Sequence, residues 1–65
     1  MINRTEKVEI ENICLALIHK KKKISRETLI DIIEKYEIQN NLSYSEDDLD
    51  NMIIAIIDDL KEFVY

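Results

Sequence analysis

Residues 45–60 have the sequence SEDDLDNMIIAIIDDL, which opens with a helix start signal and continues with helical spacing. Ser45 is a favourable N-cap residue, and Asp48, three residues later, gives a shortened capping box. Glu46 and Asp47 place negative charge at the positive end of the helix dipole. These signals predict that a helix begins directly after Ser45.

The apolar residues of this stretch lie on one side of the predicted helix. At about 100° per residue they form a stripe, made of Leu49, Met52, Ile53, Ile56, Ile57, Leu60, Phe63 and Val64. Ile54 lies outside the stripe, so we expect its side chain to be exposed. The pattern predicts a helix over about 46–63 that buries one face.

A second start signal lies twenty residues earlier in the chain. Ser25 is the N-cap, and Ile24 before it and Leu29 at the fourth helical position have the spacing of a hydrophobic staple. A helix is predicted over about 26–37. Its apolar face consists of Leu29, Ile32, Ile33 and Tyr36, with Ile30 at the margin.

The N-terminal helix is predicted over about 5–21 and begins at Asn3 or Thr5. It ends in lysines, which favour a helix C-terminus. Its main apolar face consists of Ile10, Ile13, Cys14, Leu17 and Ile18. Val8 and Leu15, seven residues apart, form a smaller apolar strip on the opposite side.

Residues 38–44 lose the helical rhythm and predict a loop. The pair Asn40-Asn41 is typical of turns, and we expect Ile38 and Leu42 to pack the loop against the core. Three amphipathic helices with short connections predict an all-α fold, a small three-helix bundle in which the 65 residues form one domain. A helix-turn-helix topology without a wing is one arrangement of such a bundle.

Composition excludes several classes of protein. The single cysteine cannot form an internal disulfide, which favours a reducing, intracellular setting. The absence of glycine excludes glycine-rich phosphate loops. The longest apolar run, Met52–Ile57, is too short for a membrane span, and charged residues interrupt the segment where a signal peptide has its apolar block. We therefore expect a cytoplasmic protein without membrane contact.

Residue types that support catalysis or metal binding are sparse. His19 is the only histidine, and Cys14 lies five residues away on the predicted buried face, so the pair has no fixed hydrogen-bonded geometry. Asp47, Asp48 and Asp50 lack the glycine turn and the terminal glutamate of a calcium loop. We expect no enzymatic activity, no cofactor and no metal.

The charges are sorted along the chain. Residues 1–26 carry seven basic and three acidic groups, whereas residues 27–65 carry two basic and eleven acidic groups. The first segment contains a basic patch that suits phosphates, an anionic membrane or an acidic partner, although a helix C-terminus also explains it. This patch consists of Lys20, Lys21, Lys22, Lys23 and Arg26.

The second segment contains a candidate partner-binding surface that imitates DNA phosphates. It consists of Glu46, Asp47, Asp50, Asp58, Asp59 and Glu62. Helix capping explains the acids at the start of the predicted helix. It does not explain Asp58, Asp59 and Glu62, which lie near the end of the helix, where the dipole favours cations.

The chain from about Ile13 onward resembles conserved region 1.1 of housekeeping bacterial sigma factors. Two stretches carry the resemblance, residues 21–29 (KKKISRETL) and residues 49–53 (LDNMI). That family has a helix ending in a basic turn, a Leu-Thr-x-Glu-Glu-Ile-like helix start, a loop, and an acidic helix of Ile-Asp-x-Ile-Ile type. The glycines that the family has in the basic turn and after the last helix are absent here. The resemblance implies an acidic helical module that occupies the DNA channel of RNA polymerase and competes with DNA.

Charge and patterning favour a non-enzymatic protein-binding module that regulates or inhibits a nucleic-acid-handling protein, such as RNA polymerase or a nuclease. Val8, Leu15 and Ile54 are candidate apolar contacts with this partner or with a second copy. The abundance of Ile, Lys and Asn is typical of AT-rich genes and favours a phage or mobile-element product in the host cytoplasm.

Two alternatives belong to other classes. One is a dimeric helix-turn-helix regulator that contacts DNA phosphates with the basic patch, although the acids of the 46–63 helix disfavour direct nucleic-acid binding. The other is a self-associating structural subunit, a homodimer in its simplest form.

Overall fold

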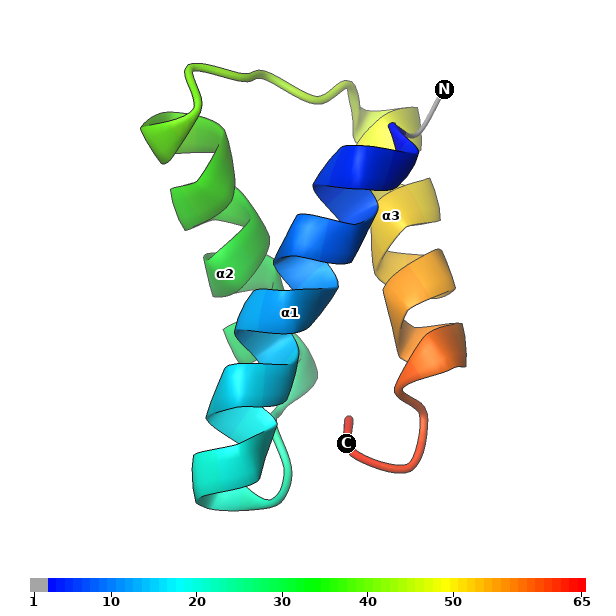
Figure 1. The fold of residues 1–65 in the computed structure, drawn as a ribbon. Coiled ribbons are helices and arrows are strands. Elements are labelled where there is room, and N and C mark those ends of the chain that lie inside the picture. Colours follow the sequence, from blue (N-terminus) through cyan, green and yellow to red (C-terminus); the bar gives the residue numbers. More distant parts are fainter. Residues whose placement is uncertain (1–2) are drawn as a thin grey trace.

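Three α-helices make up the fold in the computed structural model, which describes residues 3–65 (Figure 1). They are α1 (Arg4–Lys21), α2 (Arg26–Gln39) and α3 (Glu46–Asp59). The predicted all-α three-helix bundle is therefore confirmed. Within residues 3–65, no helix combines the length and the apolar character that crossing a membrane requires.

All three helices begin at side-chain caps. The Asn3 side chain accepts hydrogen bonds from two backbone N–H groups in the first turn of α1. Ser25 Oγ accepts one from the Thr28 N–H at 3.1 Å. Ser45 Oγ accepts one from the Asp48 N–H at 3.2 Å. Each cap satisfies a donor that has no partner inside its helix, which fixes the helix starts where the sequence predicts them.

The end of α2 lies two residues beyond the predicted end at residue 37, because the loop caps it. The Leu42 N–H donates to the Glu37 carbonyl at 2.8 Å, and the Asn41 N–H donates to the Ile38 carbonyl at 3.3 Å. These are the bonds of a Schellman motif, and Asn41 has the left-handed backbone that the motif requires, with φ of 56°. Ile38 is 80% exposed, so its predicted packing against the core is wrong, whereas Leu42 does pack there.

The end of α3 lies at Asp59, four residues before the predicted end. The chain then turns, and the Phe63 N–H donates to the Leu60 carbonyl at 2.8 Å. Val64 forms a parallel β-bridge with Ile24, in the connection between α1 and α2. This pairing removes Phe63 and Val64 from the helical stripe that their spacing predicts.

Residues 63–65 form a short segment, the C-terminal strap, that runs alongside residues 24–26. The Ile24 N–H donates to the Phe63 carbonyl at 2.8 Å, and the Tyr65 N–H donates to the Ile24 carbonyl at 3.0 Å. The Arg26 N–H donates to the Tyr65 carbonyl at 3.0 Å. The strap thereby joins the chain after α3 to the start of α2.

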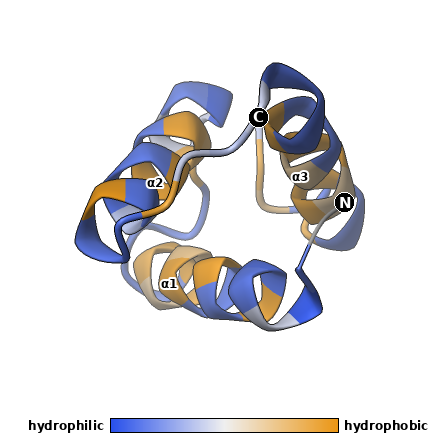
Figure 2. Ribbon diagram, turned by 90° about the horizontal axis from the view of Figure 1, so that it is seen from above, coloured by the Kyte–Doolittle hydropathy of each residue, from blue (hydrophilic) through white to orange (hydrophobic). Residues whose placement is uncertain are grey.

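The core lies where the apolar faces of the three helices meet (Figure 2). Its buried residues are Ile10, Cys14, Ile18, Ile24, Leu29, Ile33, Tyr36, Met52, Ile53, Ile56 and Leu60. α1 packs against both α2 and α3. Ile13, predicted for the buried face of α1, is 42% exposed because it lies at the edge of that face.

Candidate protein-interaction surface

A groove runs between α2 and α3. Two adjoining cavities of about 390 Å³ and about 340 Å³ share Arg26 and Ile54 in their linings, and together they are called the α2–α3 groove below. Its apolar lining consists of Ile30, Ile53, Ile54 and Ile57. Its charged lining consists of Arg26, Asp50, Asp58 and Lys61. This combination of apolar area and surrounding charge is typical of protein interfaces.

Four of the residues that the sequence nominates for partner binding share one exposed side of α3. This acidic face consists of Asp47, Asp50, Ile54 and Asp58. Spacings of three and four residues bring them onto the same side of the helix. Ile54 is 61% exposed, and acids flank it in both directions along the helix. Glu46 is exposed in the first turn of α3, and Glu62 is exposed after the helix ends.

The charges around Ile54 are available to a partner. Within residues 3–65, no ion pair involves any charged residue of the acidic face or of the groove lining, namely Arg26, Asp47, Asp50, Asp58 and Lys61. An exposed apolar side chain among unpaired charges suits a partner with apolar groups and complementary charge.

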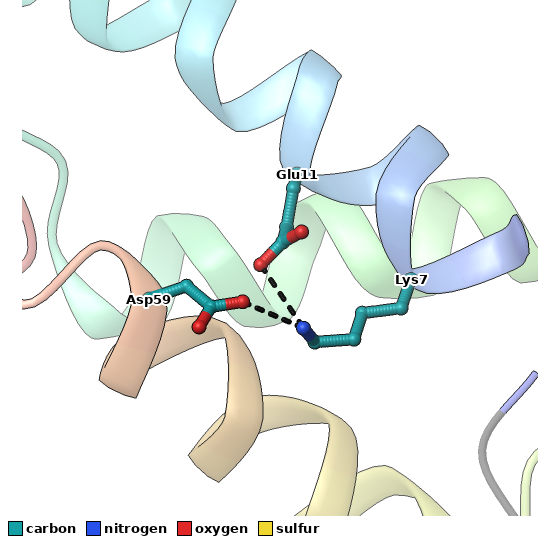
Figure 3. A network of polar contacts seen from close by, with 3 residues as sticks. All are labelled: Lys7, Glu11 and Asp59. Atoms are coloured by element: carbon teal, nitrogen blue, oxygen red, sulfur yellow. Dashed lines mark hydrogen bonds and ion pairs between the residues drawn. The ribbon is translucent and has the colours of Figure 1, made fainter. Parts of the chain in front are cut away.

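Asp59 is engaged inside the fold instead (Figure 3). Its Oδ2 accepts a hydrogen bond from Lys7 Nζ at 2.6 Å, and Lys7 Nζ also lies 3.5 Å from Glu11 Oε2. Lys7 and Asp59 are 52 residues apart in the sequence, so their bond ties the beginning of α1 to the end of α3. The acidic residue at position 59 thus has a structural role, although the sequence places it with the partner-binding acids.

Glu11 is the most buried carboxyl of this trio, with a side chain that is 15% exposed compared with 47% for Asp59. Burial raises the pKa of Glu11, and the neighbouring Asp59 raises it further, which outweighs the effect of Lys7. Glu11 and Lys7 hold the pKa of Asp59 below its usual value. Within residues 3–65, Glu11 Oε2 has no hydrogen-bond partner, so the Lys7 ammonium is its nearest compensation.

A second set of polar contacts links α1, α2 and the loop after α2. The Tyr36 hydroxyl donates to the Glu9 carboxylate, and the Tyr44 hydroxyl donates to Glu6 Oε1 at 2.8 Å. The Tyr44 N–H donates to Glu37 Oε2 at 2.9 Å. The bond to Glu9, together with burial, raises the pKa of Tyr36 to about 12, and burial together with Glu6 raises that of Tyr44. Glu6, Glu9 and Glu37 therefore have structural roles. Their partners are distant in the sequence, so the sequence alone does not predict these roles.

The remaining nominated residues lie apart from the groove. Lys20–Lys23 are exposed at the end of α1 and in the connection that follows it, while Arg26 lines the groove. Val8 and Leu15 are 45% and 43% exposed on α1, as predicted, and neither lines the α2–α3 groove. The structure thus divides the basic patch and separates the α1 apolar strip from Ile54.

Cys14 is fully buried, as predicted for a core thiol, and burial raises its pKa to about 11. A thiol with such a pKa is almost entirely protonated at neutral pH and is a poor nucleophile. His19 is exposed in the last turn of α1. Within residues 3–65, no group of three or more His, Cys, Asp or Glu side chains is placed to hold a metal ion.

Comparison with known proteins found no matching family model, no matching curated protein and no matching solved structure. The resemblance to sigma-factor region 1.1 therefore stays a prediction from the sequence. The candidate surface is defined by the geometry and charge of the α2–α3 groove and the acidic face.

Proposed function

We propose that this chain is a non-enzymatic protein-binding module that regulates or inhibits a nucleic-acid-handling protein, such as RNA polymerase or a nuclease, through the acidic face of α3. The observation that carries the proposal is the 61% exposure of Ile54 between unpaired acids. Proteins that bind nucleic acids present basic surfaces to phosphates, so an acidic surface with an apolar contact complements them.

Asp58 is the acid of this face that helix stability explains least. Asp47 lies in the first turn of α3, where the helix dipole favours an anion, but Asp58 lies in the last turn, where an anion is unfavourable. Its neighbour Asp59 is bonded to Lys7, and Asp58 has no ion pair within residues 3–65. Contact with a basic partner accounts for an acid at this position.

The test is a pull-down from cell lysate at low and high salt with two charge-matched double variants. Asp50→Asn with Asp58→Asn removes two acids from the acidic face, and Asp31→Asn with Glu34→Gln removes two exposed acids from α2. The wild type and the α2 variant should enrich nucleic-acid-binding proteins at low salt, and the α3 variant should not. The proposal is wrong if no nucleic-acid-binding protein is enriched at low salt, or if both variants lose the enrichment equally.

A DNA-binding regulator is the second candidate, favoured by the four exposed lysines at 20–23. In a helix-turn-helix arrangement α3 would enter the major groove, yet its exposed side carries Asp47, Asp50 and Asp58, which phosphates repel. A gel shift with random duplex DNA separates the two functions. Robust binding that weakens steeply with salt would favour the DNA-binding regulator over the protein-binding module.

A further inference from the structure

The C-terminal strap holds two exposed aromatic side chains on its outer side. Ile24 and Val64 form the parallel β-bridge, in which Ile24 is buried and Val64 packs against the core. Side chains alternate along an extended segment, so the two neighbours of Val64 point away from the core. These neighbours are Phe63 and Tyr65, which are 38% and 76% exposed. The core contact of Val64 thus fixes the direction of both rings.

The same bridge brings basic side chains next to the two rings. Lys23 precedes the buried Ile24, so it also points away from the core, and it is exposed. Lys22 ends α1 with a φ of 72°, and the backbone then turns into the segment that pairs with the strap. The four lysines at 20–23 therefore lie at the same end of the molecule as the strap (Figure 1). These lysines, Phe63 and Tyr65 are called the strap surface below.

The charge around the two rings is mostly positive. Residues 20–26 carry five basic groups and no acid, and residues 61–65 carry Lys61 and Glu62, so the two paired segments together carry six cations and one anion. In the part of the chain that the structure describes, no ion pair involves the lysines at 20–23. The dipole of α1 favours cations in its last turn, but Lys23 lies beyond that turn. These cations are therefore available to an anionic ligand.

Exposed aromatic rings beside cations are typical of surfaces that bind single-stranded nucleic acid. Every base has a face that can stack on an aromatic ring, and lysines contact the phosphates. Two residues of extended chain span about 6.6 Å, so Phe63 and Tyr65 can each stack on a separate base. In a duplex the bases stack on one another and are not free to stack on protein rings. Binding to an anionic membrane needs a wide apolar face, whereas the strap surface has two rings.

We propose that the strap surface binds single-stranded nucleic acid, with bases stacked on Phe63 and Tyr65 and phosphates against the lysines at 20–23. The inference goes beyond the proposed function, because the strap surface shares no residue with the acidic face of α3. The two surfaces are compatible, since a protein that handles nucleic acid holds its binding partners close to that nucleic acid.

The experiment titrates the full chain into a fluorescently labelled oligothymidylate of about 12 nucleotides at low salt and follows fluorescence anisotropy. The other probes are the same strand paired with oligoadenylate, and unlabelled vesicles of phosphatidylcholine and phosphatidylserine as competitors. The single strand should bind about tenfold or more tightly than the duplex, and the vesicles should not displace it. Tyr65→Ala, which keeps the backbone N–H of the strap, should weaken binding about tenfold. Tyr65→Phe keeps the ring and should bind as the wild type does.

Two lysine variants test the phosphate contacts. Lys23→Gln should reduce the slope of log affinity against log salt by about 0.7, the value for one phosphate contact on a single strand. Lys35→Gln removes an exposed lysine of α2 and is the matched control, so its slope should equal that of the wild type.

The strap proposal is overturned if Tyr65→Ala binds the single strand as tightly as the wild type does, if the duplex binds as tightly as the single strand, or if the vesicles displace the oligonucleotide. Asp50→Asn with Asp58→Asn should not weaken oligonucleotide binding, because neither aspartate belongs to the strap surface. Loss of protein enrichment in that double variant and loss of oligonucleotide binding in Tyr65→Ala are therefore separate results, and either proposal can fail without the other.

Discussion

Glu11 is the residue at which burial and charge conflict most directly. Its pKa is raised in the folded state, so the folded chain binds more protons than the unfolded chain between the two pKa values, and stability falls as pH rises through that window. Glu11→Gln cannot ionise. We expect it to raise the free energy of unfolding at pH 7 by less than about 1 kcal/mol, and to change it less at pH 4.

Urea unfolding at the two pH values measures this effect of Glu11. Glu34→Gln, on the exposed side of α2, is the control and should change stability little at either pH. A loss of stability in Glu11→Gln at pH 7 would show that the Lys7 ion pair outweighs the burial of the carboxylate.

The effect of pH on stability should have the opposite sign at Asp59. Its pKa is lowered, so its contribution to stability is present above the unfolded pKa and is lost as pH falls through the folded pKa. We expect Asp59→Asn to lower the melting temperature at pH 7, because Lys7 loses its 2.6 Å partner. The substitution should have no effect at a pH where the carboxyl groups of Glu11 and Asp59 are both protonated. Asp58→Asn, one residue earlier and without an ion pair within residues 3–65, should not lower the melting temperature in thermal unfolding followed by circular dichroism, because it removes an anion that the helix dipole disfavours.

At the scale of single elements, the helix starts were predictable because a cap is a local device. Ser25 and Ser45 bond to N–H groups three residues ahead, so all the information lies within one turn. We expect Ser25→Ala and Ser45→Ala to lower the free energy of unfolding by about 1 kcal/mol each. Ser43→Ala, in the exposed loop, should have no effect in the same urea titration. Equal effects at all three serines would contradict the capping role.

The helix ends were less predictable because their partners are distant or depend on the backbone. Phe63 and Val64 fit the helical spacing of α3, but pairing with residues 24–26 competes for the same backbone groups and prevails. The end of α2 depends on the left-handed backbone of Asn41, which the pair Asn40-Asn41 permits without specifying its position. Local spacing therefore predicts where a helix can continue, and tertiary pairing decides where it stops.

The C-terminal strap is testable through one backbone donor. Tyr65→Pro removes the N–H that bonds to the Ile24 carbonyl, while Tyr65→Ala keeps it and deletes a side chain that is 76% exposed. We expect the proline variant to lower the free energy of unfolding by about 1–3 kcal/mol and the alanine variant by less than about 0.5 kcal/mol. Urea unfolding compares them, and equal losses would mean that the strap stabilises the fold through its side chain alone.

At the scale of the whole molecule, the charge sorting of the sequence becomes a separation in space. The longest dimension is 29 Å, with Lys20–Lys23 near one end and the first turn of α3 near the other (Figure 1). Salt screens charges over about 8 Å at physiological ionic strength, so the two ends act as separate surfaces. Asp50, Ile54 and Asp58 share one exposed side of α3 because they are four residues apart, but the sequence prediction grouped the two aspartates with the other acids and Ile54 with Val8 and Leu15. The groove itself needed α2 to supply Arg26 and Ile30, which no local pattern predicts.

We predict the oligomeric state from the surface area that a dimer interface needs and from the charges that would meet in it. A specific interface buries about 600 Å² per partner at the low end, roughly an eighth of the 4822 Å² surface of this chain. Val8 and Leu15 supply only two half-exposed side chains, and symmetric contact at Ile54 brings aspartates together. We expect a monomer at all concentrations that light scattering can reach, with unchanged mass in Leu15→Asp and Ile54→Asp. A concentration-dependent dimer abolished by Ile54→Asp would assign the α2–α3 groove to self-association, and one abolished by Leu15→Asp would place the interface on α1.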